Sequence, residues 1–115
     1  MGHRVFKMSF AKVYPALLSK VQKKGKTKAQ LDEIIAWLTG YDADGLATAL
    51  ADERDVETFF NLAPAKNPNR ALIKGVVCGV RVEDIDDPVM QEIRYLDKLV
   101  DELARGKKYE SIFRG

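Results

Sequence analysis

Asp87 to Gly106 read DPVMQEIRYLDKLVDELARG, and this stretch decides the fold because its start, its apolar face and its end can all be recognised. Asp87 can accept hydrogen bonds from the free amides of a first helical turn, and Pro88 suits the first helical position, which needs no amide donor. Gly106 supplies the left-handed residue that ends many helices. We therefore predict a helix that ends near Ala104 and buries one face, onto which the other segments pack. Its apolar residues, three or four positions apart, are Val89, Ile93, Leu96, Val100 and Leu103, with Met90 and Leu99 beside them.

The length and composition predict one soluble domain. A chain of 115 residues can bury a core without disulfides or metals. Cys78 is the single cysteine, which excludes an intramolecular disulfide, and no secretion signal is recognisable. No apolar run approaches the roughly 18 residues that a membrane span requires. We therefore expect a cytoplasmic protein whose single helical domain covers residues 1–115.

The charges are unevenly distributed along the chain. The formal net charge is only +2, yet every charged residue before Asp32 is lysine or arginine, whereas residues 83–102 are strongly acidic. Such asymmetry indicates either a basic surface for an anionic partner or two ends that meet in the fold and form ion pairs. We favour the ion pairs, because opposite charges are abundant in both segments.

A first helix is expected after Ser9, which can cap it, and before Gly25, which would end it. Pro15 lies deeper than the ideal first position, so this helix either kinks in its first turn or starts near Tyr14. Residues 1–8 mix apolar and basic side chains without a helix start. We expect them to form a short flexible or extended arm.

Three more helix starts are expected before residue 67, each with a side chain that can cap the first turn. The clearest is a capping box in which Thr27 is followed three positions later by Gln30, and Gly40 would end that helix. The other two caps are Asp42 or Asp44, and Asp55. Helix therefore follows helix through this part of the chain.

Residues 67–82 can be interpreted in two ways. Asn67 and Pro68 repeat the arrangement of a cap followed by proline, which predicts a helix over residues 68–78 that ends at Gly79. Gly75 and the valines around it weaken this prediction and favour an extended segment over residues 72–82. We favour the helix, because a lone strand would have no partner elsewhere.

The predicted fold class is therefore all-α, with five to six short helices packed around the C-terminal amphipathic helix. The alternative is an α+β fold in which residues 72–82 are extended. The chain closes with a short amphipathic turn that docks on the core through Tyr109, Ile112 and Phe113.

Strings of residues along nearly the whole chain are similar to one bacterial family. They are Met8–Phe10, Val13–Pro15, Lys24–Lys28, Trp37–Tyr41, Glu57–Phe60, Asn67–Arg70, Gly75–Ile85, Asp87–Pro88 and Ile93–Leu99. In this order the chain resembles the family called domain of unknown function 2200. The resemblance implies a small bacterial cytoplasmic protein, and it implies no activity and no site residues.

Known catalytic and metal-binding patterns are missing. Zinc sites need several histidines and cysteines, and the chain has only His3 and Cys78. Cys78 lies in an apolar run and is expected to be a small core residue rather than a nucleophile. The acidic run at residues 83–87 lacks the spacing of a calcium loop and is explained by helix capping. We expect no cofactor and no metal, and we lean against an enzyme.

A weak candidate site for an anion is formed by Asn69, Arg70, Arg81 and Arg94, because arginines can clamp a carboxylate or a phosphate. A ligand binder or an enzyme that uses these arginines is therefore the second hypothesis for function. We favour the alternative that the arginines pair with Glu83, Glu92, Asp97 or the acidic run at residues 83–87. The leading hypothesis for function is a small non-catalytic binding or interaction module.

The third hypothesis is non-specific nucleic-acid binding through Lys20–Lys28. Its candidate phosphate contacts precede or open a capped helix and are Lys23, Lys24, Lys26 and Lys28. Acidic residues follow at once and no run of residues suited to base recognition is present, so binding to nucleic acid is disfavoured. We also weigh a symmetric homodimer at even odds, because Trp37, Tyr41, Phe59 and Phe60 offer more aromatic surface than one small core always hides.

Overall fold

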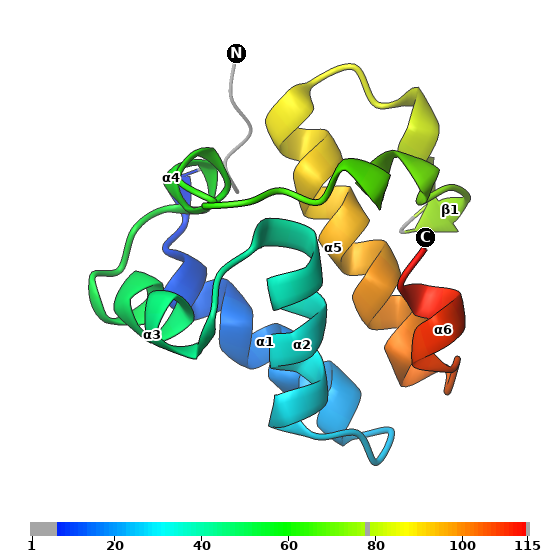
Figure 1. Ribbon diagram of the computed structural model, residues 1–115, viewed down its shortest axis with the longest axis horizontal. Helices are drawn as coiled ribbons and strands as arrows, with labels where there is room; N and C mark the ends of the chain where they lie inside the picture. The colour runs from blue at the N-terminus through cyan, green and yellow to red at the C-terminus, as the bar shows by residue number, and fades with distance from the viewer. Residues whose placement is uncertain (1–6, 78, 115) are drawn as a thin grey trace.

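The computed structural model describes residues 7–77 and 79–114, and its helices pack around the one predicted from residues 87–106. The helices are α1 (Phe10–Gln22), α2 (Lys28–Thr39), α3 (Ala43–Ala51), α4 (Val56–Asn61), α5 (Pro88–Ala104) and α6 (Tyr109–Ile112), as Figure 1 shows. Between α4 and α5 lie the short 3-10 helices η2 (Pro68–Leu72) and η3 (Val82–Asp84) and the strands β1 (Val76–Val77) and β2 (Val80–Arg81). The contacts of α5 reach α1, α2, α4, α6, β1 and η3. The predicted helix-dominated fold class is confirmed.

The described helix ends follow the capping residues closely. Asp87 accepts hydrogen bonds from the amides of Val89 and Met90, at 2.9 and 3.0 Å, and the helix α5 ends at Ala104 as predicted. The capping box of Thr27 and Gln30 is present in both directions at the start of α2. The remaining predicted caps are also confirmed, and they are Ser9 for α1, Asp42 for α3, Asp55 for α4 and Asn67 for η2.

The helix α1 starts at Phe10 and continues through Pro15, so the later start near Tyr14 is not observed. Pro15 is exposed, which lets the carbonyl that it leaves without a donor face water. The residues just before α1 are held by the segment before α4. The Phe10 amide donates to the Arg54 carbonyl and the Val56 amide donates to the Met8 carbonyl, both at 2.9 Å. The rest of the expected arm, residues 1–6, lies outside the described residues.

Gly40 ends α2 in the left-handed conformation, with φ at 81°. A side-chain carbon at this position would lie 2.7 Å from the backbone nitrogen of Ala65. The Ala65 amide itself donates to the Thr39 carbonyl at 3.0 Å. Glycine is therefore needed twice, for the backbone conformation and for the close approach of the chain that follows α4.

The helix predicted over residues 68–78 is wrong beyond Leu72. Residues 68–72 form the 3-10 helix η2, and β1 then pairs antiparallel with β2 in a two-stranded sheet. The sequence argument assumed that a strand here would have no partner, but the partner follows only a few residues later. Gly75 has φ at 113°, which a helix does not allow, and its amide donates to Glu83 Oε1 at 2.9 Å. Cys78, the expected core residue, lies outside the described residues.

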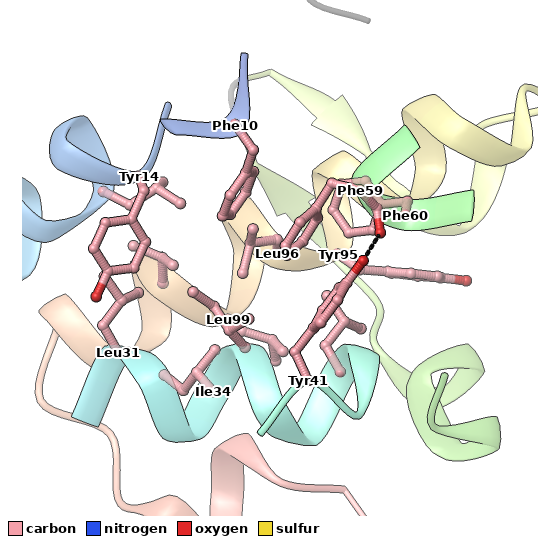
Figure 2. Close-up of a cluster of buried hydrophobic side chains, with 14 of the residues drawn as sticks. Phe10, Tyr14, Leu31, Ile34, Tyr41, Phe59, Phe60, Tyr95, Leu96 and Leu99 are labelled. Atoms are coloured by element: carbon pink, nitrogen blue, oxygen red, sulfur yellow. Dashed lines mark hydrogen bonds between the residues drawn. The ribbon is translucent and has the colours of Figure 1, made fainter. Parts of the chain in front are cut away.

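The core joins aromatic side chains from α1, α4 and the segment after α2. The rings of Phe10 and Phe59 are stacked, and the Tyr41 ring stacks on Phe59 with 4.5 Å between centroids. The Tyr41 hydroxyl donates to the Phe59 carbonyl at 2.6 Å, the dashed bond in Figure 2. Phe60 is also buried in this cluster. The buried Tyr41 hydroxyl therefore has a hydrogen-bond acceptor, and this bond links α4 to the segment just after α2.

The buried face of α5 differs from the predicted one in its N-terminal half. Leu96, Leu99, Val100 and Leu103 are buried as expected. Val89, Met90 and Ile93 are only partly buried, and Glu92 and Tyr95 take the buried positions in the first turns instead. A carboxylate and a phenol therefore lie where apolar side chains were expected.

In the described part of the chain, no helix is long and apolar enough to cross a membrane.

Candidate ligand-binding site

Each of the three candidate arginines pairs with a carboxylate. Arg94 Nη1 lies 3.0 Å from Asp97 Oδ2, within α5. Arg81 lies on β2, more than half exposed, with Nη1 3.8 Å from Glu83 Oε2 and Nε 4.0 Å from Asp84 Oδ2. Neither arginine lines the cavities described below. The favoured expectation of local ion pairs therefore matches the geometry at both positions.

Arg70 differs from the other two because its partner is buried. Its Nε donates to Glu92 Oε1 at 2.7 Å, and its Nη1 donates to the Asn67 carbonyl at 2.9 Å. The Asn67 side chain in turn accepts from the Asn69 amide at 2.9 Å, which closes the turn at the start of η2. Asn69 contributes this backbone amide and lines neither cavity described below. The guanidinium group is therefore held by η2 on one side and by α5 on the other.

Glu92 carries one carboxylate oxygen without a hydrogen-bond partner. The residue is only 7% exposed, and its Oε1 is taken by Arg70. The second oxygen, Oε2, is buried and accepts no hydrogen bond from the described residues. Leaving such an acceptor unsatisfied costs about 1–3 kcal/mol, and more for a charged group. Half of this buried carboxylate is therefore unsatisfied, which is costly for folding.

Two cavities flank the Arg70–Glu92 ion pair. Both are lined by Arg70, Gln91 and Glu92, and their volumes are about 160 Å³ and about 270 Å³. The smaller one continues towards Asn61, the last residue of α4, and Lys66, on the segment after α4. The ion pair is thus the shared wall of two hollows between that segment, η2 and the first turns of α5. We call this pair of cavities, with the residues that line them, the Arg70–Glu92 cleft.

The cleft offers further polar groups besides Glu92 Oε2. Lys66 is partly buried and forms no ion pair with the described residues. Tyr95 lines the larger cavity, and Figure 2 shows its hydroxyl pointing away from the apolar cluster. Burial raises the pKa of the Tyr95 phenol, the charge of Glu92 raises it further, and Arg70 opposes both. The two cavities beside the buried Glu92 carboxylate are therefore lined by the cations Arg70 and Lys66 and by the Tyr95 phenol.

Sequence reasoning had named Arg70, and it had named Glu92 only as a partner for arginine. It missed Lys66, Gln91 and Tyr95. A usable signal was present, because Glu92 lies four positions before Leu96 and therefore in register with the buried stripe of the helix. A carboxylate on the apolar face of a helix indicates a buried charge that needs an explanation.

The candidate lysines lie in different surroundings. Lys28 Nζ lies 2.8 Å from Asp32 Oδ2, and hydrogen bonds to Asp32 and Tyr14 raise the pKa of Lys28, so its charge is already paired. Lys23 and Lys24 are exposed at the turn after α1, and Lys26 lines a separate cavity near α6. The structure does not place any of these lysines in the Arg70–Glu92 cleft.

The expected pairing of the basic N-terminal part with residues 83–102 is limited. Among the described residues it is present at Lys20, whose Nζ lies 3.6 Å from Asp101 Oδ1.

Within residues 7–77 and 79–114, no group of three or more histidine, cysteine or acidic side chains is arranged to hold a metal ion. His3 and Cys78 lie outside those ranges.

Comparison with known proteins places the chain in a family. No curated protein matches the sequence. The crystal structure of the uncharacterised protein SP1917 is similar over 97% of this chain and 92% of that chain, with a TM-score of 0.91 and 45% sequence identity. A family model described as an uncharacterised protein conserved in bacteria matches residues 4–114, nearly the whole chain. The chain therefore belongs to the bacterial family called domain of unknown function 2200, as its sequence motifs indicated.

Proposed function

We propose that this protein is a small non-catalytic binding module that holds a zwitterionic small molecule in the Arg70–Glu92 cleft. The observation that carries the proposal is the buried, unpartnered Oε2 of Glu92. An acceptor in this state is satisfied best by a donor from a ligand, and a cationic donor gives the strongest hydrogen bond to a carboxylate. The ligand therefore carries an ammonium group.

The same cleft supports an anionic group on the ligand. The guanidinium group of Arg70 has five N–H donors, of which the described hydrogen bonds use Nε and Nη1. Lys66 lines the smaller cavity beside it. A carboxylate placed there meets two cations, while an ammonium group one or two bonds away meets Glu92. The α-ammonium and carboxylate of an amino acid have this arrangement.

The size of the cleft also favours a small ligand. A water molecule takes about 30 Å³ of the liquid, so the smaller cavity of about 160 Å³ has room for only a few non-hydrogen atoms. The terminal torsion of a glutamate is soft, which lets Oε2 turn towards a donor in either cavity. The described groups of the cleft supply hydrogen bonds and charge complementarity, which is binding chemistry.

A thermal-shift assay tests this proposal. We expect L-α-amino acids to raise the melting temperature in a concentration-dependent way, and the matching amines and carboxylic acids to raise it less, since each lacks one of the two charges. The Arg70→Gln variant should lose the effect. Arg94→Gln is the matched control, because it removes the charge of an arginine that lines neither cavity. No shift with any amino acid would contradict the proposal.

We also propose that the protein works in the cytoplasm. The single cysteine of the chain supports this, since a protein without disulfides suits a reducing compartment. Fractionation of cells that express a tagged chain tests it, and recovery outside the cytoplasmic fraction would contradict it.

A symmetric homodimer stays a prediction, but its original argument has weakened. Tyr41, Phe59 and Phe60 are buried within one chain, and the Trp37 ring stacks on Phe113 with 5.7 Å between centroids. Light scattering decides the matter, because a mass near 12.9 kDa at micromolar concentration would rule the dimer out. Among the described residues, the exposed large apolar side chains that a dimer could cover are Met8, Leu62, Leu72, Val76 and Val80.

A further inference from the structure

Two turns far apart in the sequence lie at the same end of the molecule. One connects α1 to α2, and the other connects α5 to α6, as Figure 1 shows. Both are rich in cations, and sequence reasoning had considered only the first of them. The cations of the two turns are Lys23, Lys24 and Lys26, and Arg105, Lys107 and Lys108.

A cavity of about 400 Å³ lies between these turns. Lys26 lines it from the first turn, and Lys107 and Lys108 line it from the second. Leu103 belongs to its wall and lies eleven positions after Glu92 on α5. At 1.5 Å per residue this is a separation of about 16 Å along the helix, so the cavity is a second site, distinct from the Arg70–Glu92 cleft.

The cations at this end are only partly neutralised by the described carboxylates. Among the described residues, Lys23, Lys24, Lys26 and Lys108 have no ion pair within 4.0 Å. Those that do have a partner compete for it, because Lys20 and Arg105 both approach Asp101, at 3.6 and 2.9 Å. The surface between the turns therefore carries a surplus of positive charge.

Lys107 also competes with other cations for one carboxylate. Its Nζ lies 3.7 Å from Glu102 Oε2, but Arg114 already binds both oxygens of that carboxylate, at 2.8 and 2.7 Å. Lys98 also approaches Glu102, at 3.6 Å. One carboxylate thus faces three cations, and the Lys107 side chain is half exposed. Glu110 is the acidic side chain that lines the cavity itself.

The simplest alternative is that these cations complement helix dipoles. The helices α1 and α5 both end here, and a cation near a C-terminus is worth about 0.3–1 kcal/mol. This explains residues such as Lys23 and Arg105, which follow directly after the helices. It does not explain why lysines from both turns line one cavity, since Lys26 lies beside the N-terminal end of α2, where a helix dipole disfavours cations.

An aromatic side chain completes the cavity. Tyr109 lines it, and its ring stacks on Phe113 with 5.0 Å between centroids. Phe113 in turn stacks on Trp37, so the tyrosine is the outer member of a supported stack. Lysines that meet phosphates next to an aromatic side chain on which a base can stack are the shared features of sites for single-stranded nucleic acids.

We infer that this cationic cavity binds a ligand that carries several phosphate groups and a nucleobase. Lys26, Lys107 and Lys108 contact the phosphates, and Tyr109 provides the stacking surface. A nucleoside triphosphate and a short single-stranded oligonucleotide share this chemistry. The site is separate from the proposed zwitterion site, so each can fail without the other.

Fluorescence anisotropy with a labelled oligothymidylate, in competition with a nucleoside triphosphate and with inorganic triphosphate, tests the inference. We expect binding to the wild type at low salt, and a loss of about tenfold or more in the triple variant Lys26→Ala, Lys107→Ala and Lys108→Ala. With three phosphate contacts removed, the slope of log affinity against log salt for the oligonucleotide should become shallower by about 2. A nucleoside triphosphate that displaces the oligonucleotide shows that the site accepts the free nucleotide. One that fails to displace it shows that the site prefers the oligonucleotide.

The matched control is the triple variant Lys7→Ala, Lys12→Ala and Lys74→Ala, which removes the same charge from exposed positions away from the cavity. It should bind nearly as well as the wild type. Equal losses in both triple variants, or no binding of any of the three probes at low salt, would overturn the inference. Inorganic triphosphate that competes as well as the nucleoside triphosphate would overturn the role of Tyr109. If the cavity variant does not fold, Lys108→Glu alone is measured instead, with Lys12→Glu as its control.

Discussion

Glu92 accepts a hydrogen bond from Arg70 through one carboxylate oxygen, at 2.7 Å, while its other oxygen is buried and unpartnered among the described residues. The pair joins η2 to α5 at a depth where the glutamate side chain is only 9% exposed. Removing a carboxylate from water to this extent is expensive, and one ion pair recovers only part of the cost. The arrangement is therefore a poor way to stabilise the fold, which supports the proposal that it holds a ligand.

The first prediction concerns the stability of this pair. Arg70→Met alone leaves the Glu92 charge buried without a partner and should lower the free energy of unfolding by about 3–5 kcal/mol. The double variant Arg70→Met with Glu92→Met replaces the pair by apolar side chains and should be about as stable as the wild type, or more stable. Urea unfolding measures both. A double variant that is no more stable than Arg70→Met would show that the pair is structural.

The second prediction concerns the turn after α2. Gly40→Ala places a methyl group 2.7 Å from the Ala65 backbone in a left-handed conformation, whereas Gly25→Ala, at a similar φ of 78°, meets no atom within 4 Å. Gly25→Ala should cost about 1–2 kcal/mol from the backbone conformation alone. Gly40→Ala should cost about 1–3 kcal/mol more, because the chain must move. Thermal unfolding of the two variants side by side isolates the clash, and equal costs would argue against it.

The third prediction compares two arginines that pair with carboxylates in the last turn of α5, Arg105 directly after α5 and Arg114 after α6. Arg114 donates hydrogen bonds to both carboxylate oxygens of the buried Glu102, whereas Arg105, 72% exposed, pairs with Asp101 at 2.9 Å. Arg114→Ala should lower the free energy of unfolding by about 2 kcal/mol or more, since it strips the main partner from a buried carboxylate. Arg105→Ala should cost at most about 1 kcal/mol, as is usual for exposed pairs. Comparable losses measured by urea unfolding would contradict the assigned roles.

The fourth prediction concerns alkaline pH. The Tyr14 hydroxyl donates to Asp32, and burial, followed by this hydrogen bond, raises the pKa of the Tyr14 phenol from 10.0 to about 12. A raised pKa favours the protonated, neutral phenol in the folded state. This contribution to stability is complete below about pH 10 and is lost as the pH rises through about 12.

Unfolding measured across this pH range should therefore show a decline that Tyr14→Phe reduces, because phenylalanine has no proton to lose. Tyr41→Phe is a useful comparison, since the pKa of Tyr41 is also raised by burial but its hydroxyl donates to a carbonyl rather than to a carboxylate. If Tyr14→Phe leaves the alkaline decline unchanged, the hydrogen bond to Asp32 does not control it.

The helix ends could be predicted from the sequence because capping is local. Asp87 and Thr27 lie next to the amides that they accept from, so a few consecutive residues contain the whole interaction. The hairpin could not be predicted in the same way. Gly75 needs its positive φ in a place where a side chain would approach Lys98 of α5, and this contact joins distant parts of the chain.

The cleft was predictable only in part, for the same physical reason. Arg70 was named because arginines can clamp an anion, but the burial of Glu92 depends on which face α5 turns towards η2. The spacing of Glu92 from Leu96 places it beside the buried stripe, but which side of that stripe η2 covers is decided by packing of the whole molecule. Lys26 and Lys107 likewise line one cavity because α1 and α5 end, and α2 begins, at the same end of the molecule.

The most direct test of the account is to observe the cleft by NMR while a small zwitterion is added. With isotope-labelled protein and an L-α-amino acid, we expect saturable shifts of the Arg70 Nε–H signal and of the backbone amides of Gln91, Glu92 and Tyr95. The Arg94 Nε–H signal should stay in place, because that arginine pairs with Asp97 away from the cleft. Saturable shifts confined to residues elsewhere in the chain, or none with any L-α-amino acid, would contradict the proposal that Glu92 Oε2 and Arg70 form a ligand-binding site.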